Sequence, residues 1–257
     1  MCLIAWNWQP HSATPLLLLS NRDEFYARAA QALHWWDDSA GQNQVLAGKD
    51  LQAGGTWLGV SRSGRLAALT NFRSPEPVRA NAPSRGELVA QFLQSRIAAD
   101  VFLQQLAQHA SLYNPFNLLV CDGHQLMGLQ SSGARILTLQ PGIGAVCNAD
   151  FHTPWPKLTR LTHGLAAQLE QGHSDALHLL PLLHDRHIAA DAHLPDTGVP
   201  LDLERMLSAT FITSPTYGTR ACSVVALHTH QIEFTEQGFG PQGLLKQSQQ
   251  RFTRVPP

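Results

Sequence analysis

The sequence has few charged residues, and neither sign predominates. Charged side chains make up 14% of the 257 residues, and 18 basic against 19 acidic residues give a formal net charge of −1. A balanced chain of this kind offers no basic surface for nucleic acid and no general attraction to an anionic membrane. No apolar run approaches the roughly 20 residues that a membrane-spanning helix needs, so we expect no transmembrane segment.

Cysteine is also scarce, and its spacing argues against a disulfide framework. The four cysteines, Cys2, Cys121, Cys147 and Cys222, lie far apart and form no C-x-x-C pair. The first residues contain no basic stretch and soon become polar, unlike a secretory signal peptide. We therefore expect reduced thiols in a cytoplasmic protein.

Familiar catalytic and cofactor motifs are missing as well. The chain has no G-x-S-x-G, no P-loop, no H-E-x-x-H and no G-x-G-x-x-G after a strand. The polar segment with His184, His187, Asp191 and His193 matches no metal-ligand spacing. We expect no metal and no other cofactor, and a small molecule rather than nucleic acid as the ligand or substrate. The sequence leaves the oligomeric state open.

Hydrophobic residues make up 44% of the chain, which is typical of a globular protein. Apolar runs bounded by turn residues predict strands, and a 3.6-residue period predicts helices. The expected strands cover 2–8, 15–20, 54–60, 65–70, 116–121, 125–130, 135–139, 143–148, 222–227 and 231–235, and the expected helices cover 84–93, 100–109, 155–171, 175–184 and 201–208. The tail after Gly238 is expected to be irregular.

The order of these elements indicates the fold class. Hairpins at both ends of the chain enclose a helical middle, without βαβ alternation, which predicts one α+β domain over 1–257. Two packed antiparallel sheets covered by helices are one natural arrangement. Ser84 and Glu87 have the spacing of a capping box at the start of the first helix.

Cys2 is the first candidate for chemistry. If Met1 is removed, Cys2 carries a free α-amine beside its own thiol. That amine has an ordinary pKa of about 7.7–8.0 and can act as a general base for the thiol near neutral pH. The position alone also allows Cys2 to be a small hydrophobic residue that begins a strand.

Polar residues directly after apolar strands are the next candidates. In Asn21-Arg22-Asp23-Glu24, a carboxylate could orient the amine, and an arginine could lower the thiol pKa or bind a substrate carboxylate. A salt-bridged strand end is the alternative.

Three further positions follow the same reasoning. Asn71 and Asn148 each end an apolar strand and could donate to an oxyanion, although asparagine is also common in turns. Arg220, in Tyr217-Gly218-Thr219-Arg220, could bind an anion or lie in an ordinary turn.

Five short motifs in order resemble the NRDE family, also called the Transport and Golgi organization family. They are Met1-Cys2-Leu3-Ile4, Asn21-Arg22-Asp23-Glu24-Phe25-Tyr26, Gly54-Gly55-Thr56-Trp57-Leu58-Gly59, Thr70-Asn71-Phe72-Arg73 and Tyr217-Gly218-Thr219-Arg220. The match extends from residue 2 to about residue 235. The resemblance implies a relationship to N-terminal-nucleophile hydrolases, of which the penicillin V acylase and bile salt hydrolase group is the most similar.

That relationship implies an αββα sandwich with an N-terminal cysteine nucleophile. The family pattern maps the nucleophile onto Cys2 and the other catalytic residues onto Asp23, Asn71 and Asn148. The remaining motif residues are expected to bind substrate: Asn21, Arg22, Arg73, Thr219 and Arg220. In the hydrolases an arginine lies three residues before the aspartate, where this chain has Ser20. Arg22 is adjacent to the aspartate instead, so its side chain is expected to point the other way along a strand.

Three functions remain open at this point. The first is an amidohydrolase or acyl transferase that works through a thioester on Cys2. The second is a carrier or chaperone that keeps the fold and binds a hydrophobic ligand such as haem or an acyl-CoA in a large apolar pocket. The third is a scaffold or trafficking factor, which would need no pocket.

Overall fold

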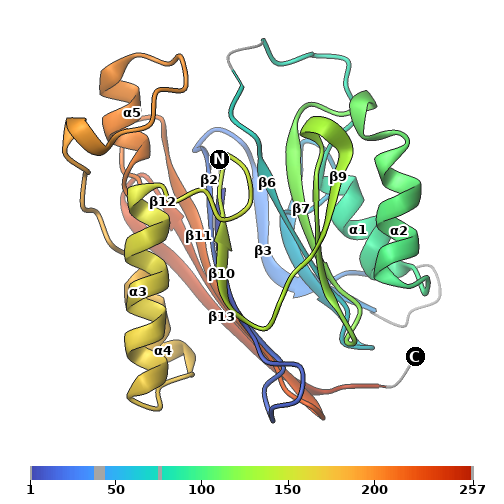
Figure 1. The fold of residues 1–257 in the computed structure, drawn as a ribbon. Coiled ribbons are helices and arrows are strands. Elements are labelled where there is room, and N and C mark those ends of the chain that lie inside the picture. The colour runs from blue at the N-terminus through green and yellow to red at the C-terminus, as the bar shows by residue number, and fades with distance from the viewer. Residues whose placement is uncertain (1, 38–43, 75–76, 256–257) are drawn as a thin grey trace.

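The computed structural model describes residues 2–37, 44–74 and 77–255, and in them two antiparallel β-sheets pack face to face. The strand order is β10-β1-β2-β11-β12-β13 in the first sheet and β3-β4-β5-β6-β7-β8-β9 in the second. Helices cover both outer faces (Figure 1). The expected α+β sandwich of two antiparallel sheets flanked by helices is therefore confirmed.

The six-stranded sheet joins strands from both ends of the chain. Its members are β1 (Cys2–Trp8), β2 (Leu16–Phe25), β10 (Gly142–Val146), β11 (Tyr217–Leu227), β12 (Gln231–Gly240) and β13 (Gly243–Thr253). The seven-stranded sheet follows chain order, with β3 (Ala30–Trp35), β4 (Val45–Asp50), β5 (Leu58–Ser61), β6 (Leu66–Asn71), β7 (Phe116–Cys121), β8 (Leu126–Gln130) and β9 (Arg135–Thr138).

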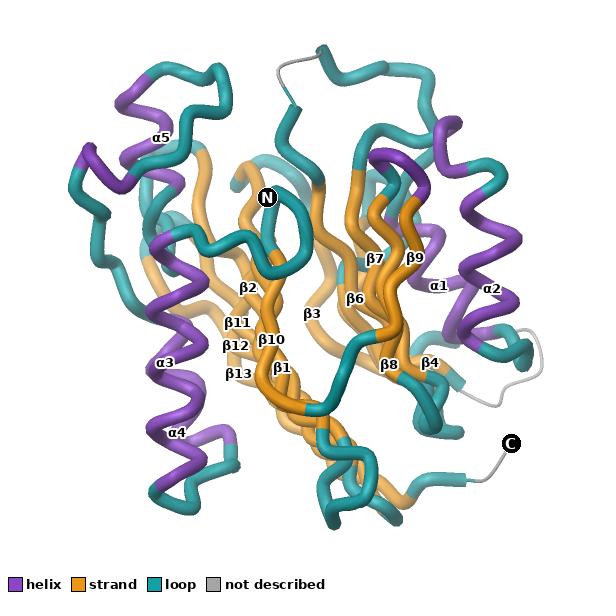
Figure 2. The backbone as a smooth tube through the Cα atoms, viewed as in Figure 1, coloured by secondary structure: helices purple, strands orange, loops and turns teal. Residues whose placement is uncertain are grey.

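The helices form the two outer layers (Figure 2). Helices α1 (Gly86–Gln94) and α2 (Ala99–Ala107) pack on the seven-stranded sheet, and α3 (Pro156–Glu170) and α4 (Ala176–Leu183) pack on the six-stranded sheet. A fifth helix, α5 (Leu201–Leu207), follows the polar segment after α4. None of the described helices is long and apolar enough to cross a membrane.

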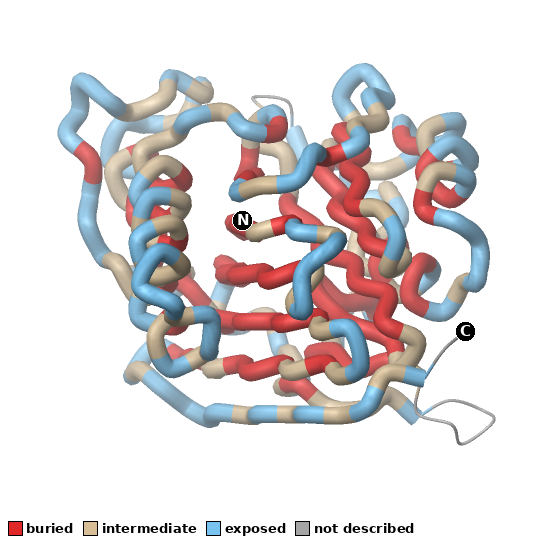
Figure 3. Tube along the Cα trace, turned by 60° about the horizontal axis from the view of Figure 1, so that its bottom comes forward, coloured by how far each residue is buried: buried red, intermediate tan, exposed pale blue. Residues whose placement is uncertain are grey.

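Strand pleating divides the apolar residues among three cores. Ile4 and Trp6 lie in the core between the sheets, whereas Leu3 and Ala5 lie against α3 and α4. The run Leu16–Leu19 alternates between the same two cores, as expected for a strand buried on both faces. A third core packs α1 and α2 on the second sheet. Figure 3 shows that burial is concentrated in the strands.

The polar tetrapeptide does not follow the second strand but lies within it. Strand β2 continues to Phe25, and residues 20–23 are buried. They remain in the strand because β2 has a partner on each side: Cys2 of β1 pairs with Arg22, and Thr219 of β11 pairs with Asp23. The motif therefore lies within the sheet, beside the first residue of β1.

Two other expectations were wrong. The tail after Gly238 is not irregular, because β12 extends to Gly240 and β13 pairs with it along its length. Strand β13 is an edge strand of mostly half-buried and exposed residues, so it lacks the apolar run that signals a strand. The capping box is also absent: Arg85 is the N-cap of α1 without a side-chain cap, and the carboxylate of Glu87 accepts a hydrogen bond from the Tyr113 hydroxyl at 2.6 Å.

Candidate active site

A cavity of about 320 Å³ lies where β1 begins and β2, β4 and β6 end. The loop between β6 and α1, the segment between β4 and β5, and Asn114 also line it. Cys2, Arg22, Asp23 and Asn71 all line this cavity. Four of the sequence-predicted site residues, from three separate strands, are thus brought to one place.

Cys2 presents a buried thiol to the cavity. The residue is 9% exposed and pairs with Arg22 across the β1–β2 ladder. Burial raises the pKa of the Cys2 thiol, and the neighbouring Asp23 carboxylate raises it further. The guanidinium of Arg22 and a hydrogen bond from the Asp23 backbone act in the opposite direction. The net shift is upward, which favours the protonated thiol over the thiolate.

Asp23 is held in one orientation by Thr219. The hydroxyl of Thr219 donates to Oδ1 of Asp23 at 2.7 Å. The Thr219 hydroxyl oxygen in turn accepts the backbone N–H of Ile212 at 2.9 Å. Accepting from Ile212 leaves the hydroxyl proton of Thr219 directed at the carboxylate. Burial raises the pKa of Asp23, which is 1% exposed, while the charge of Lys157 lowers it. Thr219 therefore positions Asp23 rather than lining the cavity.

The two asparagines take different places. Asn71, at the end of β6, is half-buried and lines the cavity, and none of the hydrogen bonds among the described residues uses its side-chain amide. Asn148 is fully buried outside the cavity. Its Nδ2 donates to the backbone carbonyl of Asn71 at 2.8 Å. Asn148 therefore fixes the end of the strand that carries Asn71.

Asn117 of β7 holds the segment around Asn148 from the opposite sheet. Its Nδ2 donates to the carbonyls of Cys147 at 3.2 Å and Ala149 at 2.8 Å. The hydroxyl of Thr70 also donates to the carbonyl of Cys147. These polar contacts join the two sheets immediately behind the cavity.

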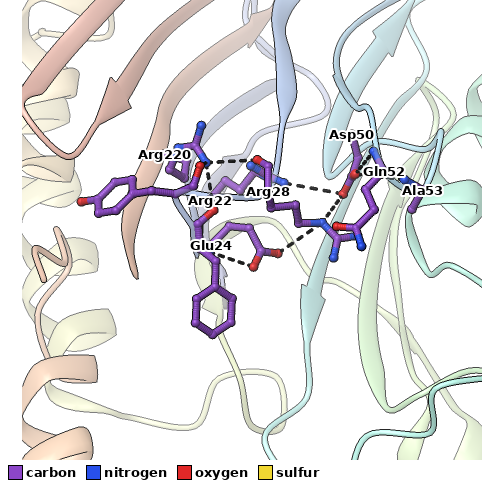
Figure 4. A network of polar contacts seen from close by, with 9 residues as sticks. Arg22, Glu24, Arg28, Asp50, Gln52, Ala53 and Arg220 are labelled. Atoms are coloured by element: carbon purple, nitrogen blue, oxygen red, sulfur yellow. Dashed lines mark hydrogen bonds and ion pairs between the residues drawn. The ribbon is translucent and has the colours of Figure 1, made fainter. Parts of the chain in front are cut away.

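Arg22 belongs to a charged network at the cavity wall (Figure 4). Its guanidinium lies 4.3 Å from the centre of the Trp57 ring and 3.6 Å from the Asp50 carboxylate. Arg28 contacts the same Asp50 oxygen at 2.7 Å and Glu24 at 3.7 Å. The arginines are therefore neutralised by carboxylates and stacked on an aromatic face, which fixes Arg22 beside Cys2.

The pleat explains why Arg22 can lie near Cys2 although the hydrolase pattern has its arginine at position 20. Side chains two residues apart on a strand share a face, so Ser20 and Arg22 lie on the same side of β2. Ser20 donates to the carbonyl of Leu3, one step deeper in the sheet. Arg22 therefore does not point the other way from position 20, contrary to expectation, and it borders the cavity.

Besides Thr219, three expected substrate-binding residues lie outside the cavity: Asn21, Arg73 and Arg220. Asn21 is fully buried, and its Nδ2 donates to the carbonyls of Leu183 and Thr210 at 2.9 Å each. Arg73 forms a buried ion pair with Glu204, with Nη1 2.6 Å from Oε2. The structure brings neither residue to the cavity that contains Cys2.

Arg220 is also occupied by backbone contacts. Its guanidinium donates to four carbonyl oxygens, those of Phe25, Tyr26, Arg28 and Phe239. A β-bulge at this point of β11 interrupts its pairing with β2 between Thr219 and Ala221. Arg220 thereby ties the chain just after β2 to the end of β12 and does not reach the cavity.

Lys157 is a residue that sequence reasoning missed. It is 2% exposed, and its Nζ has no hydrogen-bond partner in the described part of the chain. Its charge lowers the pKa of Asp23, so the ammonium lies close to the site. The helical period contained the signal, because Lys157, Leu161 and Leu165 are spaced at i, i+4 and i+8 on the buried stripe of α3.

Comparisons with known proteins identify the family of this chain. The model of the family described as Transport and Golgi organisation 2 matches residues 1–241. The chain belongs to this family. The Transport and Golgi organization protein 2 homolog of Bos taurus is 36% identical over 92% of both chains, and that of Homo sapiens is 32% identical over the same shares. The Drosophila melanogaster protein is 29% identical over 95% of both.

This chain shares its fold with a solved hydrolase and a solved amidase. A mutant of the conjugated bile acid hydrolase from Clostridium perfringens superposes with a TM-score of 0.51 at 8% identity, covering 100% of this chain and 98% of that one. The Caenorhabditis elegans ortholog of N-acylethanolamine-hydrolyzing acid amidase gives 0.52 at 10% identity, covering 87% and 92%. These similarities establish the N-terminal-nucleophile hydrolase fold, and the family name itself specifies no reaction.

Proposed function

We propose that this protein is an N-terminal cysteine amidohydrolase or acyl transferase that acts on a small amide through a thioester on Cys2. The observation that carries the proposal is the cavity that Cys2, Asp23 and Asn71 line together. The fold shared with two amide hydrolases supports it. A volume of about 320 Å³ suits a small molecule rather than a polymer.

The reaction begins once Met1 has been removed and the α-amine belongs to Cys2. The amine takes the thiol proton, and the sulfur attacks the amide carbonyl carbon to form an S–C bond. The C–N bond breaks as the leaving nitrogen takes the proton from the α-ammonium. Water, deprotonated by the same amine, then cleaves the thioester, releasing the acid and restoring the thiol. An amine acceptor in place of water gives acyl transfer.

Asp23 and Asn71 support these steps. The Asp23 carboxylate accepts from the α-ammonium and, aligned by Thr219, holds the amine beside the sulfur. The side-chain amide of Asn71 donates to the oxyanion that develops on the carbonyl oxygen, a contact typically worth about 3–4 kcal/mol in the transition state. Asn148 acts through Asn71 by fixing its backbone.

The carrier of haem or an acyl-CoA is the other function considered, and the cavity lining weighs against it. The carrier hypothesis predicts a large apolar pocket. The observed lining contains four arginines, Arg22, Arg28, Arg79 and Arg85, and three acidic residues, Asp23, Glu24 and Asp50. A polar amide with its own charge fits such a lining better than the broad apolar ring of haem does.

The removal of Met1, which the proposal requires, agrees with a cytoplasmic protein. All four cysteines are buried free thiols, as expected where thiols are kept reduced. Initiator methionine is commonly removed when the second residue is small. A cytoplasmic location thus forms part of the proposal.

The test combines a peptide map with an amide screen. Mass spectrometry of the N-terminal peptide separates protein that begins at Cys2 from protein that retains Met1. Both forms, together with Cys2→Ala, are assayed for release of amine from a panel of N-acyl amides. We expect turnover only in the form that begins at Cys2.

Two outcomes contradict the proposal. Equal turnover by Cys2→Ala would show that the sulfur does not attack. Turnover by the form that retains Met1 at the rate of the processed form would show that the α-amine is not the base. Cys121→Ser is the matched control, because this thiol is buried in β7 and borders no part of the cavity.

A further inference from the structure

Two cavity arginines differ from the others in having no carboxylate partner. Arg79 and Arg85 line the cavity on the loop before α1. Among the ion pairs of the described residues, Arg22 and Arg28 contact Asp50, whereas Arg79 and Arg85 have no acidic group within 4.0 Å. The carboxylates of this wall are therefore already engaged, and these two guanidinium groups remain uncompensated.

The loop is held so that both arginines are placed in advance. Asn114 accepts the backbone N–H of Arg79 at 2.8 Å and donates to its carbonyl at 3.0 Å. The Arg79 Nη2 donates to the carbonyls of Ser111 and Tyr113. One segment before β7 thus fixes both the backbone and the side chain of Arg79.

Arg85 is fixed to the same segment. Its Nη1 donates to the carbonyl of Pro115 at 3.0 Å. A guanidinium carries five N–H donors, so one bond to a carbonyl leaves most of them available to a ligand. Placing the arginines before the ligand arrives reduces the ordering cost of binding.

Arg85 also lies within electrostatic reach of the nucleophile. Burial lowers the pKa of Arg85, and the Cys2 thiolate and the Glu24 carboxylate oppose that change. Cys2, Arg79 and Arg85 line the same cavity, so a ligand that fills it would contact both the thiol and the arginines. An anion in this position would satisfy donors that the protein leaves unused.

We propose that the substrate of Cys2 is an amide that carries a carboxylate or phosphate group, which Arg79 and Arg85 bind. This inference rests on the proposed function, but it can be tested by binding alone. Both anions match the planar fork of a guanidinium. The charge preference, not the identity of the acyl chain, is the quantity to measure.

The experiment uses two matched pairs of probes and the Cys2→Ala protein, which cannot form a thioester. The first pair is N-hexanoylglycine and the neutral N-hexanoylglycinamide. The second is N-hexanoyl-O-phosphoethanolamine and the neutral N-hexanoylethanolamine. Calorimetry gives each dissociation constant at low and high salt. We expect the anionic member of at least one pair to bind about ten-fold or more tightly, with the difference shrinking at high salt.

Variants assign the preference to the two arginines. Arg85→Gln and Arg79→Gln, each made in the Cys2→Ala background, should reduce it about ten-fold, and Arg85→Lys should keep part of it. Arg135→Gln removes an exposed arginine at the start of β9 and should leave it unchanged. Urea unfolding of each variant establishes that the loop has not unfolded.

The outcomes separate this inference from the proposed function. Equal affinity for both members of each pair, binding of none of the four probes, or an unchanged preference in folded Arg85→Gln overturns the inference. Cleavage of the neutral probes by the processed protein without a charge preference keeps the amidohydrolase and rejects the anion site. A charge preference without any turnover keeps the anion site and rejects the hydrolase.

Discussion

The ion pair between Arg73 and Glu204 allows a direct test of a motif residue that the structure places outside the cavity. Both side chains are nearly inaccessible, at 6% and 5% exposure, and Nη1 lies 2.6 Å from Oε2. Removing one member of a buried pair typically costs about 3–5 kcal/mol, because the remaining charge is left without its partner. In Arg73→Met, Glu204 would retain hydrogen bonds from the backbone N–H and hydroxyl of Thr197.

Those remaining contacts place the expected loss at the lower end, about 3 kcal/mol. A second consideration acts in the same direction: Nε and Nη2 of Arg73 are buried and have no hydrogen-bond partner among the described residues, so their removal relieves a cost. Urea unfolding followed by circular dichroism measures the change. Adding Glu204→Gln removes the stranded charge, so the double variant should be less destabilised than the two single changes summed.

The control is Arg160→Met, which breaks a half-exposed pair with Asp185 and should cost under about 1 kcal/mol. The reasoning fails if Arg73→Met unfolds at the same urea concentration as the wild type. It also fails if this variant keeps its stability and instead weakens binding of the substrate, because Arg73 would then act as the motif suggests.

Three other changes probe the surroundings of the cavity. Gly55→Ala should destabilise the protein by about 2 kcal/mol or more, because a Cβ would lie 2.6 Å from the Gly86 carbonyl oxygen; an unaltered melting temperature would contradict this. Asn117→Leu should cost about 2–4 kcal/mol in urea unfolding, since the Ala149 carbonyl loses its donor and the Cys147 carbonyl keeps only that of Thr70, and a neutral result would show that water replaces the lost donor. In protein that retains Met1, the rate of Cys2 alkylation should reach half its maximum above the pH typical of a free thiol, because the pKa of the thiol is raised. Arg22→Met should move that midpoint further upward, and a downward shift would refute the assigned charge effect.

Much of the fold could be predicted because its elements carry strong local patterns. The buried run Leu16–Leu19, the hairpin signals around Asp122-Gly123 and the periodicity of 155–171 each correspond to an observed element. Strand β13 could not be found in this way, since its residues alternate weakly and its stability comes from pairing with β12. Strands β3 and β4 were missed as well; β3 is an edge strand like β13, whereas β4 is an interior strand of six residues. Edge strands carry little of the apolar signal on which sequence reasoning depends.

The site was only partly predictable because a motif gives neighbours in sequence, not neighbours in space. Asn21 and Asp23 share a face of β2, yet two residues of strand separate them by about 6.6 Å, which puts Asn21 under α4 instead of in the cavity. Arg79 and Arg85 belong to a proline-rich loop whose path depends on Asn114, far away in the chain. Short motifs therefore marked the region, and long-range contacts decided which residues enter it.

The raised pKa values of Cys2 and Asp23 make removal of Met1 more than a way to expose a nucleophile. As buried groups, both favour their neutral forms, and each ionised form disfavours the other. An α-ammonium on Cys2 itself would be the nearest positive charge to both, and an opposite charge at that distance favours thiolate and carboxylate together. Because the two acids and the amine then share their protons, they titrate as one unit rather than as three independent groups. Processing would thus convert two inert buried acids into an activated nucleophile without moving the backbone.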